Sequence, residues 1–223
     1  MKKKSLVTMV ASLSLVAAVG VGSTLAFLSD KTDTLVNSFS TATGYTDDDH
    51  SVQIQETKFG TDAKYSYGQD GFTGNAYTDL LPGDSVKKDP NVVLGAESID
   101  SYIFIRVVGA DALVATDNDE DGKGDFSIDE FNTNWVKVDG NDDELDGIYV
   151  YKAGEGEDAY KVVAGTTTDD LFTTVTYNKD VTADVAVDLP EIALTAYAVQ
   201  YKNVSLADAT DIVKSATPVV LAE

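Results

Sequence analysis

The sequence contains no cysteine and a single histidine, His50, among its 223 residues. Without cysteine the chain can form no disulfide bond, no thiolate metal site and no cysteine nucleophile. One histidine is too few for a His₃ zinc centre, and His50 lies in no pattern that matches a catalytic triad or a His-Glu-x-x-His motif. Most familiar hydrolase chemistry is therefore excluded, and we expect a protein that is not an enzyme and has no catalytic residues.

Basic residues are scarce as well. The chain has 16 Lys and Arg residues against 38 Asp and Glu residues, which gives a formal net charge of −22. A surface of this charge repels nucleic-acid backbones, so we expect no nucleic-acid partner. The remaining composition, with 43% hydrophobic and 24% charged residues, is typical of globular proteins, and the length favours one domain.

The first 26 residues have the pattern of a signal peptide. Three lysines follow Met1, a run of apolar and small residues extends from Leu6 to Val21, and small residues continue to Ala26. This order of charged, apolar and small-residue regions predicts cleavage between Ala26 and Phe27. Because cleavage would remove three lysines and no acidic residue, the length would change from 223 to 197 residues and the net charge from −22 to −25.

We therefore expect a secreted protein that contacts the membrane only before processing. A retained membrane anchor is the alternative, because the apolar run, extended to Leu28, would nearly span a bilayer core of about 30 Å. An exported chain without cysteine suits the surface of a Gram-positive bacterium, where disulfide bonds are not a routine means of stabilisation.

Short alternating segments separated by turn residues dominate residues 45–223. Ser101–Val108 is rich in β-branched and aromatic residues and is apolar on both faces, which is typical of a central strand. About seven strands of this kind predict an all-β fold, an antiparallel β-sandwich formed as a single domain by residues 45–223. The other expected strands are Ser51–Thr57, Asn91–Leu94, Trp135–Val138, Gly147–Lys152, Phe172–Tyr177 and Ile192–Tyr201.

One short helix is expected near the C-terminus, over Ser205–Lys214. Ser205 can cap its first turn, and Asp208 follows three residues later in the capping-box position. Leu206, Ala209 and Val213 lie on one face of this helix, so we expect it to pack on the surface of the sandwich.

The most specific chemical pattern is DNDEDGKGD, over Asp117–Asp125. Carboxylates at loop positions 1, 3, 5 and 9 and glycine at position 6 match the first part of an EF-hand-type Ca²⁺ loop, in which alternate oxygens surround a hard cation. Position 12, the place of a bidentate glutamate, is Ile128, so Ca²⁺ would bind in the weak range of roughly 10⁻⁴–10⁻³ M. The alternative is a solvated acidic hairpin tip without a metal. The candidate Ca²⁺ ligands are Asp117, Asp119, Asp121 and Asp125.

Arg106 is the only arginine, and it lies in the middle of the expected strand Ser101–Val108. A guanidinium among apolar residues needs a carboxylate or carbonyl partner to offset the loss of its hydration. We therefore interpret Arg106 as a structural residue, with ligand recognition as the lesser alternative.

Several segments of the chain resemble, in the same order, a known family of exported proteins. The segments are Ser23–Asp30, Val36–Ser40, Leu81–Pro90 leading into Ser101–Val108, Gly147–Tyr151 with Leu171 and Phe172, and Ala196–Gln200. They are spread over nearly the whole chain and are similar to the TasA-like and camelysin-like family, whose members are processed by a SipW-type signal peptidase.

The resemblance implies a jelly-roll-like β-sandwich that is exported, cut by a SipW-type signal peptidase and assembled into extracellular fibres of a biofilm matrix, alone or with other matrix proteins. In TasA-like fibres the freed N-terminal segment adds as a strand to the next subunit, which is β-augmentation. Here residues 27–44 would form this N-terminal arm. Its apolar side chains would be Phe27, Leu28, Leu35, Val36 and Phe39.

Three alternatives stay open. The arm can fold back as the first strand of its own sandwich. Camelysin-like members have been classed as metallopeptidases, although this sequence has no second histidine to complete a zinc-protease pattern. The third alternative is a Ca²⁺-stabilised adhesion module at the cell surface that never polymerises.

Overall fold

The computed structural model describes residues 29–31, 35–37, 52–96, 98–181 and 189–217. The expected signal peptide and its cleavage site between Ala26 and Phe27 lie outside these residues, as do Leu28, Phe39 and His50. Over the described ranges, no helix is both long enough and apolar enough to cross a membrane.

Short strands dominate the described chain, and every pairing among them is antiparallel, so the expected all-β class is confirmed. Only α3 exceeds five residues among the helices of this part of the chain. The elements are β1 (Ser29–Lys31), β2 (Leu35–Asn37), β3 (Val52–Thr57), β4 (Lys64–Ser66), the 3₁₀ turn η1 (Gln69–Gly71), β5 (Ser85–Lys87), β6 (Asn91–Leu94), β7 (Ser101–Val108), α2 (Ala110–Val114), β8 (Phe126–Ile128), β9 (Trp135–Asp139), β10 (Gly147–Tyr151), β11 (Thr174–Tyr177), β12 (Ile192–Gln200) and α3 (Leu206–Ser215).

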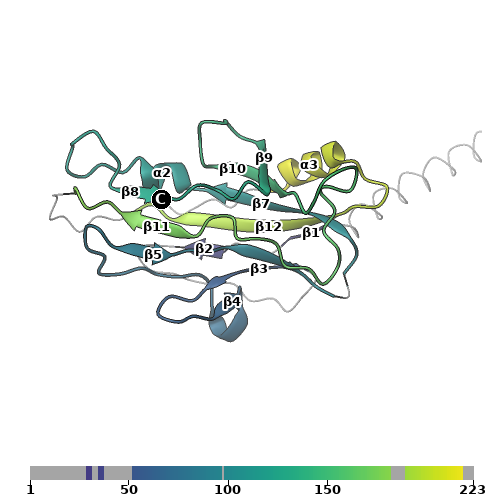
Figure 1. Cartoon of the computed structure of the whole chain (residues 1–223), viewed down its shortest axis with the longest axis horizontal. Coiled ribbons are helices and arrows are strands. Elements are labelled where there is room, and N and C mark those ends of the chain that lie inside the picture. Colours follow the sequence, from purple (N-terminus) through teal and green to yellow (C-terminus); the bar gives the residue numbers. More distant parts are fainter. Residues whose placement is uncertain (1–28, 32–34, 38–51, 97, 182–188, 218–223) are drawn as a thin grey trace, which may run out of the picture.

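β7 and β12 form the centre of the largest sheet, which has six strands in the order β1-β12-β7-β10-β9, with β2 also paired to β12 (Figure 1). The two central strands pair over eight residues, from Ser101 opposite Gln200 to Val108 opposite Ala193. Seven of the eight residues of β7 and eight of the nine of β12 are buried, because both faces of the sheet are covered. This burial explains why β7 is a continuous apolar run rather than an alternating one.

Two three-stranded sheets, β5-β11-β8 and β4-β3-β6, supply the second layer of the core. Ile103 and Ile105 from β7 and Leu194 from β12 belong to one buried cluster with Ile54 from β3 and Leu94 from β6. The alternate residues of the large sheet therefore share a single hydrophobic core with the two small sheets, and the burial of this core is the main favourable term in folding.

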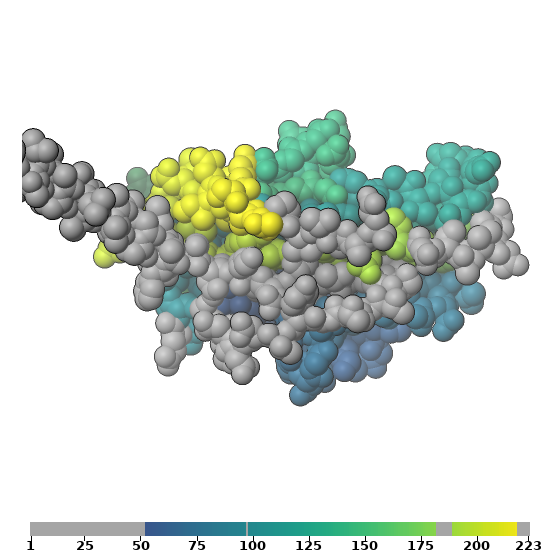
Figure 2. Space-filling view, turned by 180° about the vertical axis from the view of Figure 1, so that it is seen from behind, coloured from purple at the N-terminus to yellow at the C-terminus, as the bar shows by residue number. Residues whose placement is uncertain are grey.

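α3 covers the opposite face of the large sheet and lies at the surface in the space-filling view (Figures 1 and 2). Phe104 and Val150 of the sheet pack with Ala209 and Val213 of the helix. The Oγ atom of Ser205 accepts a hydrogen bond from the amide of Asp208 at 3.1 Å, as the capping position predicts. The expected helix is thus confirmed.

Arg106 joins β7 to the C-terminal end of α3. Its guanidinium donates hydrogen bonds to the carbonyl oxygens of Val213 at 2.6 Å and Ala216 at 3.1 Å, and it lies 5.6 Å from the centre of the Tyr197 ring. The side chain is only 8% exposed. The carbonyl partners that the sequence required are therefore those at the negative end of a helix dipole.

All seven strands expected from the sequence are present, each within two residues of its expected bounds. The chain also forms β4, β5 and β8, which the sequence pattern did not predict. Each of these strands has three residues, which is too short for an alternating pattern to stand out from the surrounding loops.

Candidate functional site

The N-terminal strands β1 and β2 lie along the outer edge of β12. Ser29 is paired with Val199 in β1, and Leu35 is paired with Leu194 in β2. The numbers of two paired residues add up to 228 throughout the β1–β12 ladder and to 229 throughout the β2–β12 ladder. β1 and β2 therefore pair with β12 in nearly the same register, with a shift of one residue between them. In the single chain this part of the arm is therefore paired with its own sheet, which is the fold-back arrangement.

The outer edge of β12 is covered by short strands. Among the described residues, the backbone groups on the outer side of β12 are paired only through β1 and β2, which have three residues each. Removal of these strands would leave a row of unpaired amides and carbonyls on a strand whose side chains are largely buried. An open edge of this kind is a template for a strand from another molecule.

The acidic loop between α2 and β8 is held in shape by two glycines. Gly122 has φ of +81°, a left-handed conformation that side chains other than glycine rarely adopt, and it occupies loop position 6 as the Ca²⁺-loop pattern requires. At Gly124 a Cβ atom would lie 2.0 Å from the carbonyl oxygen of Val114, so only glycine allows the loop to approach α2 this closely.

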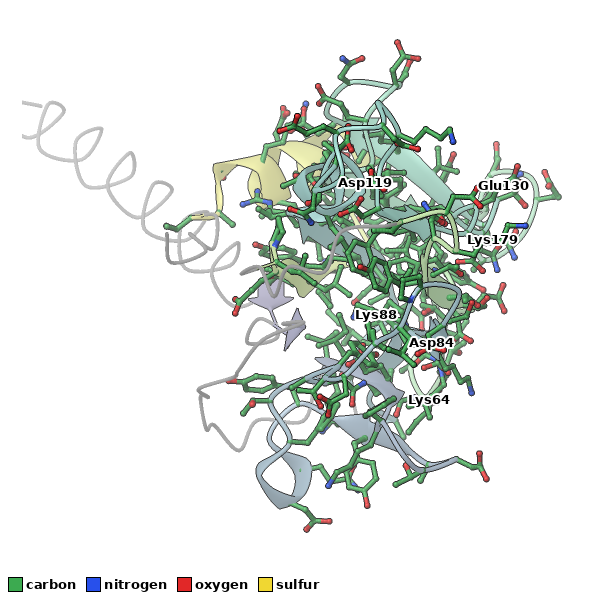
Figure 3. All side chains as sticks on the ribbon, turned by 90° about the vertical axis from the view of Figure 1, so that its left-hand side faces the viewer. Lys64, Asp84, Lys88, Asp119, Glu130 and Lys179 are labelled. Carbon is green, nitrogen blue, oxygen red and sulfur yellow. The ribbon has the colours of Figure 1, made fainter. Side chains whose placement is uncertain are left out.

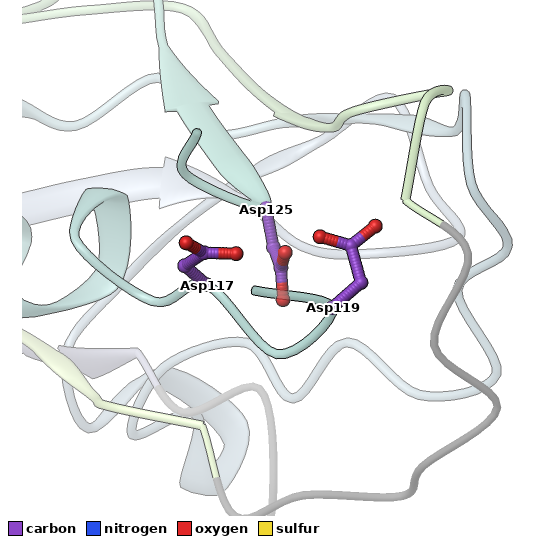
Figure 4. Close-up of side chains that lie close together, drawn as sticks. All are labelled: Asp117, Asp119 and Asp125. Carbon is purple, nitrogen blue, oxygen red and sulfur yellow. The ribbon is translucent and has the colours of Figure 1, made fainter. Parts of the chain in front are cut away.

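Three of the four candidate ligands come together in this loop (Figure 4). Oxygen atoms of Asp117, Asp119 and Asp125 all lie within 4.8 Å of one another. Asp121 is not part of this group, because its carboxylate is 3.2 Å from Nζ of Lys123 and accepts a hydrogen bond from the Lys123 amide at 2.8 Å.

Backbone amides orient the two partly exposed carboxylates. Asp117 accepts hydrogen bonds from the amides of Asp121 at 3.2 Å and Gly122 at 3.0 Å, and Asp119 accepts one from Asp121 at 3.3 Å. A carboxylate oxygen has more than one lone pair, so these bonds fix the orientation of the side chains and leave acceptor capacity for a cation.

Lys88, which is labelled in Figure 3, forms a buried ion pair with Glu56. Lys88 Nζ is 2.7 Å from a carboxylate oxygen of Glu56, and both side chains are 0% exposed. Asn75 donates a hydrogen bond to the other carboxylate oxygen at 2.7 Å. Burial raises the pKa of Glu56 and lowers the pKa of Lys88, while their mutual attraction opposes both shifts.

This ion pair is not predicted from the sequence, although the alternating pattern of β3 indicates that Glu56 is buried. Val52, Ile54 and Glu56 occupy alternate positions and face the same core, so the strand period of two places the glutamate inside. No comparable pattern marks Lys88, which lies just after the unexpected strand β5.

Comparisons of the chain with family models, with curated proteins and with solved structures give no match. The described residues thus present a sheet edge paired with two short N-terminal strands, a cluster of three carboxylates and a buried ion pair. Of the expected arm residues, Leu35 and Val36 lie in β2, whereas Phe27, Leu28 and Phe39 lie outside the described residues.

Proposed function

We propose that the protein is a secreted structural subunit that assembles into extracellular fibres by β-strand addition of its N-terminal arm, residues 27–44. One observation carries this proposal: the described part of the arm occupies the outer edge of β12 as two short strands at one end of the chain. The jelly-roll-like topology, export through a signal peptide cut after Ala26 by a SipW-type signal peptidase, and a role in the matrix of a Gram-positive bacterium belong to the same proposal.

Strand exchange between subunits is physically simple at this edge. The arm of one subunit would form the same backbone ladder with β12 of the next subunit that it forms with its own β12, so the hydrogen bonds gained equal those lost. Head-to-tail repetition of this contact generates an open filament rather than a closed dimer. Association of this kind needs no catalytic residues, and we assign none.

A second candidate function is a cell-surface adhesion module that Ca²⁺ stabilises and that does not polymerise. The convergence of Asp117, Asp119 and Asp125 favours this candidate. It differs from the fibre subunit in one measurable property, since it predicts that the purified protein stays monomeric at all salt and Ca²⁺ concentrations.

A reversible lock on the arm tests the strand-addition mechanism. Val36 and Ala193 are directly opposite in the β2–β12 ladder, and opposed Cα atoms in such ladders are roughly 4.5–5.5 Å apart, within the range for a disulfide. The chain has no cysteine of its own, so Val36→Cys/Ala193→Cys introduces the only thiols. The oxidised monomer should form no filaments in electron micrographs, and a reducing agent should restore them.

A disulfide elsewhere provides the matched control. Gln53 and Val93 are opposite each other in the β3–β6 ladder, which belongs to a different sheet from β12, so oxidised Gln53→Cys/Val93→Cys should still assemble. A chain that lacks residues 27–43 should remain monomeric. Equal filament yield from the oxidised Val36→Cys/Ala193→Cys protein and from the wild type would refute the strand-donor role of the arm.

A further inference from the structure

Asp125 has an unusual position for an acidic residue. It lies immediately before β8 and is 1% exposed. One carboxylate oxygen accepts hydrogen bonds from the backbone amide of Asn118 at 3.1 Å and from its side-chain amide at 2.6 Å. The other carboxylate oxygen, Oδ1, is buried and has no hydrogen-bond partner. A buried acceptor without a partner costs free energy, and the cost is larger when the group is charged.

The surroundings of this carboxylate indicate what would satisfy it. Figure 4 shows the Asp125 side chain between those of Asp117 and Asp119. Three carboxylates at this spacing repel one another unless a cation lies among them. Within the loop, Lys123 forms its ion pair with Asp121, which is outside the cluster. The unpartnered oxygen of Asp125 and the mutual repulsion of the three carboxylates therefore point to the same missing component, a bound cation.

The chemistry and spacing of the cluster favour Ca²⁺ among common cations. Its ligands are oxygens, which hard cations prefer, and the described loop offers no nitrogen or sulfur ligand. The three ligand oxygens lie within 4.8 Å of one another, and the longer bonds of Ca²⁺, about 2.3–2.6 Å, and its flexible geometry suit such a cluster better than the short bonds of about 2.0–2.1 Å and near-ideal octahedron of Mg²⁺. Ca²⁺ is therefore the common cation that best fits these three carboxylates.

An open pocket of ≈ 180 Å³ beside the cluster gives the ion an entry path and room for bound water. Asp119 and Asp125 line it together with residues 178–181, which follow β11. Residues 178–181 are joined to the loop by hydrogen bonds. The backbone amide of Asn178 donates to the carbonyl oxygen of Asp125 at 2.7 Å, and its side-chain amide donates to the carbonyl oxygen of Gly124 at 2.7 Å.

We propose that Asp117, Asp119 and Asp125 bind one Ca²⁺ ion, with Asp125 as the buried anchoring ligand and with Asp121 outside the coordination shell. Water molecules complete the coordination, because the loop has Ile128 where a bidentate glutamate would be. The ion fastens the loop to β8 and to the end of β11, and it raises stability by binding the folded state only. The site stands on its own geometry and does not depend on fibre assembly.

Thermal unfolding and titration calorimetry with CaCl₂ test the site. Ca²⁺ at several millimolar should raise the unfolding temperature of the wild-type protein by about 2–4 °C, EGTA should reverse the shift, and Mg²⁺ should produce a smaller one. Asp119→Asn and Asp125→Asn should weaken Ca²⁺ binding about tenfold or more, whereas the matched variant Asp121→Asn should change it by less than about twofold. Asp119 is partly exposed, so Asp119→Asn keeps the test decisive if Asp125→Asn fails to fold.

Terbium provides a second readout of location. Tyr177 is opposite Phe126, the residue after Asp125, in the β8–β11 ladder, so its phenol lies near the proposed ion. Tb³⁺ bound to the cluster should emit on excitation of tyrosine, Ca²⁺ should displace it, and Tyr177→Phe should lower the emission without removing the Ca²⁺-induced thermal shift. The proposal is overturned if Ca²⁺ gives the wild-type protein neither a heat of binding nor a higher unfolding temperature, or if Mg²⁺ raises that temperature as much as Ca²⁺ does. It is also overturned if Asp121→Asn weakens Ca²⁺ binding as much as Asp119→Asn does, or if Tyr177→Phe leaves the terbium emission undiminished.

Discussion

At the scale of single residues, the interior contains a charge pair whose two members depend on each other. Lys88 and Glu56 are both fully buried, and each is the ion-pair partner of the other at 2.7 Å. Desolvation of two charges consumes most of the free energy that their attraction returns, so the pair adds little net stability. The loss of one member is a different matter, because it leaves the other charge buried without compensation.

Lys88→Met should therefore destabilise the protein by about 3–5 kcal/mol, because Glu56 would stay buried without a cation. Urea denaturation measures this change in the free energy of unfolding. The double variant Glu56→Gln/Lys88→Met should recover a large part of the loss, since it contains no unpaired buried charge. If the double variant is as unstable as the sum of the two single variants, the two residues do not act as a pair.

A neighbouring carboxylate gives stability a dependence on pH. Desolvation acts to raise the pKa of Asp89, but hydrogen bonds from the Thr57 amide and hydroxyl group, at 2.7 and 2.8 Å, and the charge of Lys64 outweigh it and lower this pKa. The ordinary pKa of an aspartate is about 3.9, so the contribution of Asp89 to stability is fully present above that pH. It is lost as the pH falls through the lower pKa of the folded state.

Thr57→Val removes the hydroxyl hydrogen bond while it keeps the shape of the side chain. At pH 7 we expect a loss of about 1.5–3 kcal/mol, since the bond is made to a charged group. Below pH 3 the difference between wild type and variant should shrink, because the wild type has then lost part of the same interaction. Denaturation curves at a series of pH values test this, and a constant difference at every pH would show that the hydroxyl does not act through the Asp89 charge.

At the scale of elements, a helix or strand could be predicted from the sequence when local residues determine it, and could not when pairing with a distant segment determines it. β7 and α3 were predictable because their signals are local: a long run of β-branched and aromatic residues in one, and a capping serine with an apolar face in the other. β5 and β8 were not, because their short strands form only through β11, which is nearly 90 residues from β5 in the chain. Tertiary pairing, and not local propensity, makes these segments strands.

The same distinction applies to the candidate site. The glycine and carboxylate spacing of residues 117–125 predicted a cation-binding loop, and the left-handed Gly122 fits that pattern. The exclusion of Asp121 could not be predicted, since it depends on the neighbouring Lys123 forming an ion pair with this carboxylate. The burial of Asp125 likewise depends on β8 and on residues after β11, which come from other parts of the chain.

Arg106 links two elements, so its replacement should affect both. Arg106→Met keeps the apolar stem but removes the hydrogen bonds to the carbonyl groups of Val213 and Ala216. We expect a loss of about 1.5–3 kcal/mol and a weaker helical signal in far-UV circular dichroism as the end of α3 frays. Lys161→Met is the matched control, because this cation has a surface ion pair with Asp158 and a contact with the Tyr201 ring, but no hydrogen bond to a helix carbonyl group among the described residues. Its replacement should change stability by less than about 1 kcal/mol, and equal effects of the two variants would contradict a capping role for Arg106.

At the scale of the whole molecule, charge opposes assembly. The chain carries a net charge of −22 before any processing, so subunits repel one another until salt screens the repulsion. The screening length decreases from roughly 30 Å at 0.01 M salt to roughly 10 Å at 0.1 M. A filament that forms by strand exchange therefore has to overcome an electrostatic repulsion between subunits, and the salt concentration sets the strength of that repulsion.

Filament growth, followed by light scattering, should accelerate as NaCl is raised from about 0.01 M to about 0.1 M, because the barrier between subunits decreases. KCl at equal ionic strength should act in the same way, since the effect is screening rather than specific binding. Slower growth at the higher salt concentration would mean that attraction between charged groups, and not backbone pairing, holds the subunits together.

The central claim, that β2 of one subunit pairs with β12 of another, is tested most directly by cross-linking two single-cysteine proteins. Val36→Cys and Ala193→Cys each contain one thiol in a chain that otherwise has none, and the two positions are opposite in the ladder. When equal amounts are mixed, assembled and then oxidised, the account predicts covalent dimers that contain one chain of each kind on a non-reducing gel. Filaments that form from the mixture but yield only monomers after oxidation would contradict it.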